Sequence, residues 1–340
     1  MALMAKAKNV TLADIAAEVG VSNVAVSKAL SGKPGVSEEL RSKIKQISEQ
    51  MGYLPGGPGR TGGTETGNIG VIIPEYYYGY SVSFYGKLHE NVVRVLYDNQ
   101  YYGILELLSS EDEKARNLPK VLQDKKVDGL VFLGQINEEY VLEVIKHAEV
   151  PFFFLDTYLP SAGIDTVISD SYYGTYELTN YLIEQGHKKI GFVGNVDVTS
   201  SIADRFWGYR RALRENHIRF EEQWEIQDRD EGGKTFEVIL DSPNGMDAFV
   251  CNCDYTAYAL IQDLTDAGYS VPEDVSVVGF DNYLPVGMDH KITTYAVDME
   301  YMAKLCVRSL IKKIKHKRYV PGIQIVTGQI IHKQTVRNRK

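Results

Sequence analysis

The N-terminal part of the chain repeats hydrophobic positions at helical spacing in three short stretches. Apolar residues three or four positions apart line one face of a helix, which predicts these inward-facing sets: Leu12, Ile15, Ala16 and Val19; Val26, Ala29 and Leu30; Leu40, Ile44, Ile47 and Met51. Thr11 and Asp14 have capping-box spacing, Ser22 and Ser37 suit the starts of the next two helices, and Gly20 permits a tight turn. Two short helices joined by a Gly turn and braced by a third predict a DNA-reading helix-turn-helix, whose second helix would enter the major groove.

Beyond residue 67 the pattern changes to short apolar runs that alternate with amphipathic stretches. The predicted strands are 69–73, 103–107, 127–133, 152–155, 166–168, 189–194, 248–251, 275–279 and 294–297. The predicted helices lie near 84–98, 111–124, 138–147, 174–185, 203–215, 232–240, 254–267 and 299–315. Continuous Val, Ile and Leu strands with helices between them predict doubly wound parallel sheets. So many strands indicate two α/β lobes, with a ligand in the crevice at the carboxyl ends of the strands.

A Gly-rich stretch, GGPGRTGGTETG at 56–67, separates the two patterns and predicts a linker. We therefore expect a headpiece over 1–55 and a core over 68–340. Charge follows this division. The net charge is −8, but residues 1–60 carry eight Lys or Arg and five Asp or Glu, which leaves −11 on the remainder. A basic head on an acidic body indicates that contact with DNA is confined to the head.

Composition excludes several classes of protein. With 44% hydrophobic and 24% charged residues, the chain is typical of a soluble globular protein. It has no apolar run near the ~20 residues of a membrane span and no apolar signal segment, so we expect no membrane partner. The three cysteines, Cys251, Cys253 and Cys306, indicate reduced thiols in the cytoplasm. The common catalytic and phosphate-binding motifs and a metal-ligand cluster are absent from the sequence, so we expect no enzyme activity, no catalytic residue, no metal and no cofactor.

Polar side chains at predicted strand ends and helix starts are the candidates for ligand binding. Arg205 opens the helical run RFWGY, and its guanidinium can hold two hydroxyls or a carboxylate. Asn252 and Asp281 follow predicted strands, where an amide and a carboxylate would face the crevice. Asp156 and Asp170 stand at two further strand ends, where each could equally be a simple cap.

The run PEYYYGY at 74–80 lies on the predicted loop after the first strand of the core. Aromatic faces pack against the apolar face of a sugar ring, while tyrosine hydroxyls bond its rim. We expect at least one cleft contact from this run, with Tyr77 and Tyr78 as the candidates. The alternative for each tyrosine is packing at the surface of the lobe.

Two parts of the chain resemble known proteins. The headpiece is similar to that of the LacI/GalR family of bacterial regulators, through Thr11, Asp14, Ile15, Ala16, Gly20, Val21, Ser22, Val26, Ser27, Val36, Ser37, Gly52, Tyr53 and Pro55. The core resembles the two-lobed fold shared by periplasmic binding proteins and such regulators, through IGVIIP at 69–74, VDGLVFLG at 127–134, VPFFFLD at 150–156, YLIEQGHKKIGFVG at 181–194, DRFWGYRRAL at 204–213, VPEDVSVVGFDN at 271–282 and ITTYAVD at 292–298. The resemblance implies one lobe from about 68–168 and 299–323, and another from about 169–298 and 324–340.

The resemblance also implies a function, that of a transcriptional regulator. The simplest form is a repressor of carbohydrate-utilisation genes that binds a pseudo-palindromic operator as a homodimer. The implied DNA-binding residues are Thr11, Ser22, Asn23, Val24, Ser27 and Lys28. Arg205 and Asp281 would lie in the cleft, where a sugar biases a two-state equilibrium of the lobes. A purine or a co-regulator protein as the effector, or a solute-binding protein without a regulatory role, remain alternatives.

The chain departs from the family pattern at two places. Relatives usually carry Thr and Arg around the Val-Ser of the second helix, where this chain has Ala25 and Lys28, so base choice would rest on Asn23, Val24 and Lys28. Relatives also have a linker helix whose Leu wedges into the minor groove. The corresponding position is Gly62, and because internal glycines disfavour a helix, we expect weaker or less coupled operator binding.

Overall fold

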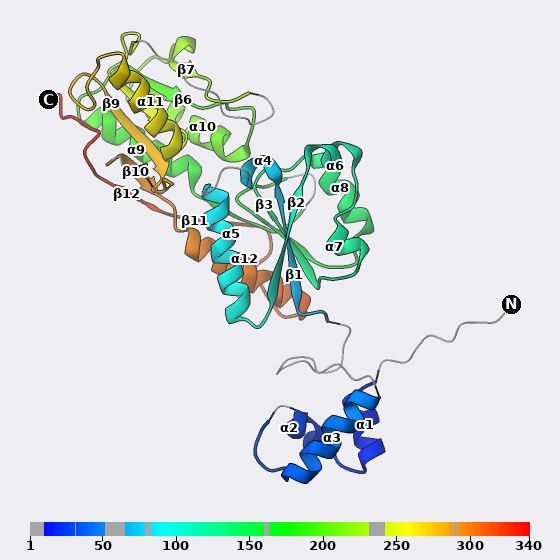
Figure 1. Ribbon diagram of the computed structural model, residues 1–340. Coiled ribbons are helices and arrows are strands. Elements are labelled where there is room, and N and C mark those ends of the chain that lie inside the picture. The colour runs from blue at the N-terminus through cyan, green and yellow to red at the C-terminus, as the bar shows by residue number, and fades with distance from the viewer. Residues whose placement is uncertain are drawn as a thin grey trace. The chain divides into compact units, whose positions relative to one another are not determined.

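The computed structural model describes residues 10–30, 32–51, 65–78, 83–159, 163–230, 242–285, 287–288 and 291–340. The chain forms two compact units, Met1–Gly67 and Asn68–Lys340 (Figure 1). Several predicted features lie outside the described residues, namely linker residues 56–64, the helix near 232–240, and Gly52, Tyr53, Pro55 and Tyr80.

The first unit holds three helices: α1 (Leu12–Val19), α2 (Asn23–Leu30) and α3 (Glu38–Gln50). The capping box is present, because the Asp14 amide donates to Thr11 Oγ1 over 3.2 Å and the Thr11 amide donates to Asp14 Oδ2 over 2.8 Å. Gly20 ends α1 with a φ of 77°, a left-handed conformation that suits glycine. The buried core consists of Ile15, Ala16, Val26, Ala29 and Ile44, from the faces that the spacing predicts.

The first lobe of the second unit is built on a six-stranded sheet of order β11-β5-β4-β3-β1-β2, in which every neighbouring pair is parallel. Its strands are β1 (Asn68–Pro74), β2 (Tyr102–Leu108), β3 (Gly129–Leu133), β4 (Phe152–Leu155), β5 (Thr166–Ser169) and β11 (Ile323–Val326). Its helices are α4 (Glu75–Tyr78), α5 (Phe84–Asp98), α6 (Ser110–Ala115), α7 (Lys120–Gln123), α8 (Glu138–His147) and α12 (Met299–Ile314). Strand β3 is buried along its whole length, as expected of a parallel strand covered on both faces.

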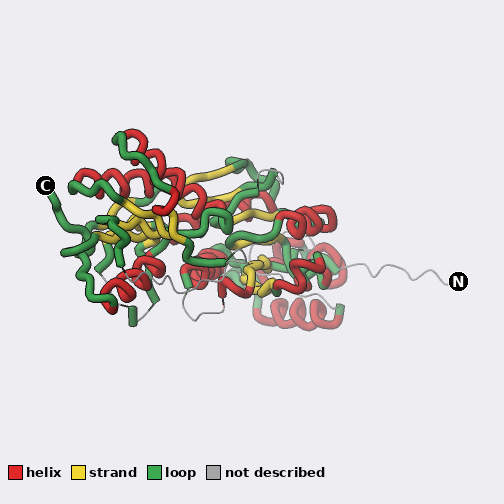
Figure 2. Tube along the Cα trace, turned by 90° about the horizontal axis from the view of Figure 1, so that it is seen from above, coloured by secondary structure: helices red, strands yellow, loops and turns green. Residues whose placement is uncertain are grey.

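The second lobe repeats this plan with a sheet of order β12-β10-β9-β8-β6-β7, parallel except for β12, which pairs antiparallel with β10. Its strands are β6 (Ile190–Val193), β7 (Glu225–Ile226), β8 (Ala248–Cys251), β9 (Ser276–Asp281), β10 (Thr293–Ala296) and β12 (Gln329–Ile331). Its helices are α9 (Ser171–Glu184), α10 (Ser200–Glu215), the short 3₁₀ helix η2 (Glu222–Trp224) and α11 (Asp254–Asp266). In the view of Figure 2, helices of the core lie on both sides of its strands.

The chain passes between the two sheets three times: from β5 to α9, from β10 to α12, and from β11 to β12. The last passage follows Val326, so the lobe boundary expected after residue 323 is placed too early. The reason is that β11 continues the first sheet by pairing in parallel with β5.

Some local predictions are wrong. The single helix expected over 111–124 is two short helices, α6 and α7, because Arg116 adopts a left-handed φ of 57° and Pro119 precedes the second helix. The tyrosine run expected on a loop begins with a helical turn, α4. Strands β7, β11 and β12 were not predicted, since they are only two to four residues long and lie at or beside sheet edges. Among the described helices, none is long and apolar enough to cross a membrane.

Candidate functional site

Helix α2 presents one polar face to its surroundings. Asn23, Val24, Ser27 and Lys28 are all exposed, whereas Val26 on the opposite face is fully buried. Val24 is 63% exposed, which leaves it available to a thymine methyl group. This face therefore has the composition and exposure of a base-reading surface.

Two other predicted DNA-binding residues have local structural roles. Ser22 Oγ accepts from the Ala25 amide over 3.2 Å at the start of α2, and Thr11 caps α1. Their hydroxyls are thus engaged in helix capping, and any contact with a phosphate would be made in addition to it.

Arg41 of α3, which sequence reasoning missed, fixes the end of α2. Its guanidinium donates to the carbonyl oxygens of Lys28 over 3.2 Å, Ala29 over 2.9 Å and Lys33 over 2.9 Å. Arg41 adds to the turn bonds at this helix end, where the Lys33 amide donates to the Lys28 carbonyl over 3.0 Å and the Gly32 amide to the Ala29 carbonyl over 3.5 Å. It thereby ties the last turn of α2 to the residues that follow it. The partners are backbone groups positioned by the turn after α2, so no local pattern of residues in α3 predicts them.

The second lobe brings Arg205, Asn252 and Asp281 together. Arg205, near the start of α10, donates from Nη1 to the backbone carbonyl of Asn252 over 2.5 Å and from Nη2 to Asp281 Oδ1 over 3.2 Å. Its guanidinium also stacks on Phe280, 4.0 Å from the ring centroid. Arg205 and Asp281 are buried, so the pair interacts with little screening by water.

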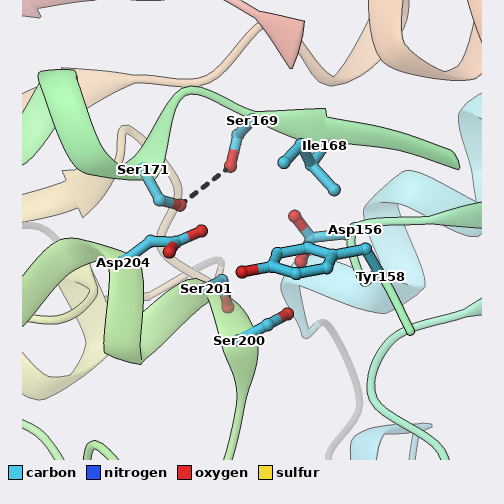
Figure 3. Close-up of a pocket in the computed structure, with 8 residues that line it drawn as sticks. All are labelled: Asp156, Tyr158, Ile168, Ser169, Ser171, Ser200, Ser201 and Asp204. Atoms are coloured by element: carbon cyan, nitrogen blue, oxygen red, sulfur yellow. Dashed lines mark hydrogen bonds between the residues drawn. The ribbon is translucent and has the colours of Figure 1, made fainter. Parts of the chain in front are cut away.

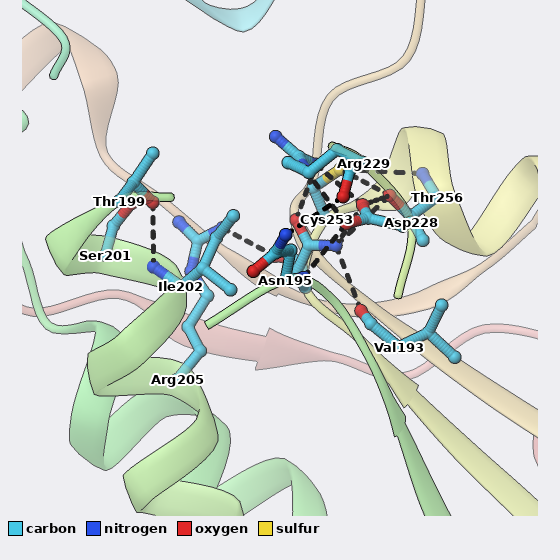
Figure 4. A network of polar contacts seen from close by, with 11 residues as sticks. Val193, Asn195, Thr199, Ser201, Ile202, Arg205, Asp228, Arg229, Cys253 and Thr256 are labelled. Atoms are coloured by element: carbon cyan, nitrogen blue, oxygen red, sulfur yellow. Dashed lines mark hydrogen bonds and ion pairs between the residues drawn. The ribbon is translucent and has the colours of Figure 1, made fainter. Parts of the chain in front are cut away.

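The Asn252 amide is engaged by the protein itself. Its Nδ2 lies within hydrogen-bonding distance of Val193 O, Asp228 Oδ2 and Thr256 Oγ1, and its Oδ1 accepts from Arg229 over 3.1 Å. Figure 4 labels these four partners. In this structure the side chain holds its neighbours in place, and its predicted contact with a ligand stays a prediction. Asn252 links Arg205 to the Asp228–Arg229 pair.

Asp228 and Arg229, which follow β7, form a second buried ion pair that sequence reasoning missed. The Arg229 fork donates to both carboxylate oxygens of Asp228, over 2.9 and 2.7 Å. The Arg229 guanidinium and bonds from Thr256 and Asn252 keep the pKa of Asp228 below its usual value even though burial opposes this. A polar pair directly after a predicted strand would have marked these residues as candidates, but β7 is too short to be predicted from the sequence.

The first lobe contributes Asp156, at the end of β4, where its φ is 62°. Burial raises the pKa of Asp156 to about 6, against the opposing effect of Arg205 and of bonds from Tyr85 and Ser169. Burial also raises the pKa of Asp281 to about 7, with Arg205 opposing and the Asp156 charge adding to the rise. Two carboxyl groups from different lobes thus share the field of one guanidinium.

The two predicted tyrosines of α4 have different surroundings. Tyr77 packs against Tyr85, with ring centroids 4.5 Å apart, and both rings cover Gly134. Burial raises the pKa of Tyr77 and of Tyr85 well above the ordinary value. Tyr78 packs edge-on against His89 at 5.8 Å instead. Of the two, Tyr77 is the one that lies with the cleft residues, since the Asp156 and Arg229 charges act on it.

The lobes meet directly beside these residues. Gln135 Oε1 of the first lobe accepts from Thr157 over 2.9 Å and from the Ser200 amide of the second lobe over 3.5 Å. The cavity between the lobes is only about 10 Å³, room for a water molecule, and is lined by Asp156, Tyr158, Ile168, Ser169, Ser171, Ser200, Ser201 and Asp204 (Figure 3). Asp170 is not among the lining residues; it caps α9 by accepting from the Tyr173 amide over 3.2 Å. Among the described residues, no cluster of His, Cys, Asp and Glu could hold a metal ion.

Comparison with known proteins agrees with both units. Residues 11–56 match the family described as bacterial regulatory proteins, lacI family, and residues 179–336 match the periplasmic binding protein-like domain. Catabolite control protein A of Priestia megaterium is 29% identical over 92% of this chain and 94% of its own. The HTH-type transcriptional repressor PurR of Aliivibrio salmonicida is 28% identical over 95% of this chain and 99% of its own.

Solved structures share the fold at lower identity. The lac repressor dimer bound to operator and an anti-inducer has a TM-score of 0.71 and 19% identity, covering 97% of this chain and all of that chain. A complex of the transcriptional regulator CelR with cellobiose has a TM-score of 0.70 and 22% identity, covering 96% and 100%. The headpiece and the two-lobed core define a DNA-binding transcriptional regulator. The chain belongs to the lacI family of bacterial regulatory proteins, which are regulators rather than enzymes.

Proposed function

We propose that this chain is a cytoplasmic, homodimeric repressor of carbohydrate-utilisation genes, released from or held on its operator by a neutral sugar between the two lobes. The observation that carries the proposal is the buried Arg205–Asp281 pair, which stands at the carboxyl end of the second sheet and shares its field with Asp156 of the first lobe. A ligand that bridges these groups stabilises one arrangement of the lobes over another.

The charge balance of the cleft favours a neutral effector. Arg205 is paired with Asp281 and also interacts with the Asp156 charge, and Arg229 is paired with Asp228. An effector phosphate or carboxylate would therefore meet guanidinium groups whose charge is already balanced by carboxyl groups of the protein. A polyol needs donors and acceptors instead. Within the described part of the chain, Arg205 Nε and Asp156 Oδ1 are buried and make no hydrogen bond, so they supply one of each.

The relatives support this proposal without deciding it. They include catabolite control proteins and, at the level of fold, a regulator in complex with cellobiose. PurR repressors match equally well, and the Tyr77–Tyr85 pair offers an aromatic surface that could stack on a base, so a purine is the second candidate. The lacI-type headpiece argues against a solute-binding protein without a regulatory role.

The exposed edge of the first lobe supports a homodimer. Tyr97 at the end of α5 is 74% exposed, and Tyr102 and Leu107 on the edge strand β2 are 70% and 45% exposed. An edge strand with exposed apolar side chains is a template for association. A dimer formed here would present two headpieces, as a pseudo-palindromic operator requires.

A thermal-shift screen of neutral sugars, sugar phosphates and purines tests the proposed effector. A ligand at 100 times its Kd stabilises the protein by about 2.7 kcal/mol, which is readily detected. We expect a neutral sugar to raise the melting temperature and to change operator binding in a gel shift. Stabilisation by a purine alone, or by sugar phosphates alone, would contradict the proposal.

A further inference from the structure

One segment of the acidic core is strongly basic. Residues 312–318 read KKIKHKR, with five Lys or Arg and no acidic residue, although residues 61–340 carry a net charge of −11. Lys312, Lys315, Lys317 and Arg318 are exposed, whereas Lys313 is half-buried and paired with Asp165. Among the described residues, neither Lys317 nor Arg318 lies within ion-pair distance of an acidic side chain.

This segment lies at the end of the first lobe where the chain enters the core. Lys315 Nζ lies 5.6 Å from the ring centroid of Tyr101, which precedes the strand residue Tyr102 that pairs with Asn68. A Cβ on Gly129 would lie 3.0 Å from Ile314, and Gly129 pairs with Ile69. The end of α12 is therefore beside the start of β1, as Figure 1 also shows.

Two further lysines widen this surface and three acidic residues reduce it. Lys126 is exposed, and its carbonyl accepts from Asn68 Nδ2 over 2.9 Å; Lys125 is exposed and lies 3.5 Å from Glu149. Asp98 and Asp124 are exposed and lie close in the sequence to Tyr101 and Lys126, respectively. The local balance remains positive, in contrast to the rest of the core.

Helix capping explains only part of the segment. Lys312 and Lys313 lie in the last turn of α12, where cations offset the helix dipole. Lys315, Lys317 and Arg318 come at or after the C-cap, so the dipole does not account for all three. These residues follow the end of α12, which lies beside β1, the strand with which the core begins.

We propose that Lys315, Lys317 and Arg318 form a second, sequence-independent contact with DNA, made to the phosphates that flank the operator half-site. The chain from Met51 to Asn68 spans at most roughly 60 Å, so a duplex held by the headpiece stays within reach of this end of the core. Lys and Arg that neutralise phosphates release counterions and strengthen binding without reading bases. Such contacts would compensate for the affinity that is lost because the linker sequence lacks the apolar wedge.

The test compares the full-length protein with a triple variant, Lys315→Gln, Lys317→Gln and Arg318→Gln. The control is Lys188→Gln, Arg214→Gln and Arg219→Gln, three exposed residues of the second lobe with the same change in charge. Operator DNA selected from a random duplex library is used as a minimal duplex and with about 15 flanking base pairs on each side. Affinity is measured from 50 to 200 mM salt.

We expect the wild type and the control to bind the long duplex more tightly than the short one, and the triple variant to lose that advantage. Three phosphate contacts change the slope of log affinity against log salt concentration by about 2.7. On the long duplex, raising the salt from 50 to 200 mM should therefore reduce the affinity of the variant by a factor about 40-fold smaller than the factor for the wild type. An unchanged slope and affinity on the long duplex would overturn the proposal, as would an equal loss on both duplexes. Binding of the wild type, but not the variant, to phosphatidylglycerol vesicles with DNA binding unaffected would assign the surface to a membrane instead.

Discussion

Arg205 and Asp281, 76 positions apart in the chain, form a buried ion pair in which Nη2 donates to Oδ1 over 3.2 Å. This pairing leaves the cleft close to neutral, which is why a neutral effector is proposed. Asp281→Asn keeps a hydrogen-bond acceptor but frees the guanidinium charge. We expect the variant to lose affinity for the neutral sugar and to gain affinity for the corresponding sugar acid, measured by calorimetry. Equal losses for both ligands would show that Asp281 does not set the charge preference.

The stability of the protein should depend on pH through the same carboxyl group. The pKa of Asp281 is about 7 in the folded protein, above the ~3.9 of an unfolded aspartate, so the folded state keeps a proton that the unfolded chain has lost. This contribution to stability is present near pH 4 and declines as the pH rises to about 7. Asp156 acts in the same sense, with a pKa of about 6, and His89, whose pKa burial lowers, acts in the opposite sense.

The variant Asp281→Asn removes that contribution, while Asp156 and His89 are present in both proteins. Burial and the Asp281 charge also raise the pKa of Asp254 to about 8, so the variant loses less stability through Asp254 as the pH rises, which changes the difference in the same direction. We expect the difference in melting temperature, variant minus wild type, to rise steadily between pH 4.5 and 7.5. A difference that is constant across this range would mean that Asp281 is already ionised in the folded protein at acidic pH.

Arg41→Gln should destabilise the C-terminal end of helix α2. The variant loses charge-assisted bonds to three carbonyl groups at and beyond the end of α2, an effect of about 1.5–3 kcal/mol on the headpiece. We expect faster limited proteolysis within the headpiece and weaker operator binding, with the melting of the core unchanged. The control Lys45→Gln makes the same charge change on an exposed residue of α3 and should leave proteolysis at the wild-type rate.

Lys28→Ala should reduce the discrimination between operator and scrambled duplex. Lys28 is exposed on the same face of α2 as Asn23 and Val24, and loss of a base contact costs ~1–3 kcal/mol. Lys33→Ala removes an exposed charge just beyond α2 and should reduce the affinity for operator and for scrambled duplex by the same factor. If Lys28→Ala also weakens both duplexes by the same factor, Lys28 contacts phosphates rather than bases.

The headpiece could be predicted closely because its signals are local. The Thr11–Asp14 capping box, the Gly20 turn and the faces that bury Ile15, Val26 and Ile44 all follow from residues within one helix or turn. In the core, the helices at 84–98 and 138–147 have the predicted bounds. Strong periodicity and side-chain caps at Ser83 and Asn137 fix those bounds.

The cleft could be predicted only in part because its contacts are long-range. A helix start pointed to Arg205, and strand ends pointed to Asn252 and Asp281. Nothing local shows that the Asn252 amide is engaged by Asp228, 24 positions away. Arg229 was missed because the two-residue strand before it carries no periodic signal. Asp170 carries the same strand-end signal as Asp156, and only tertiary structure separates a helix cap from a cleft residue.

The most direct test of the account is release of, or retention on, operator DNA by the effector in Arg205→Ala. Removing the guanidinium should reduce the binding free energy of the effector by ~1.5–3 kcal/mol, or its affinity on the order of tenfold to a hundredfold. The reason is that the oxygen atoms of the effector lose a buried charge-assisted hydrogen bond. Operator affinity without effector should equal that of the wild type, and the control Arg214→Ala, on the same helix but exposed, should respond normally. We predict that the effector concentration for half-maximal response in a gel shift rises tenfold or more in Arg205→Ala alone. A response at the wild-type concentration would contradict the placement of the effector site between the lobes.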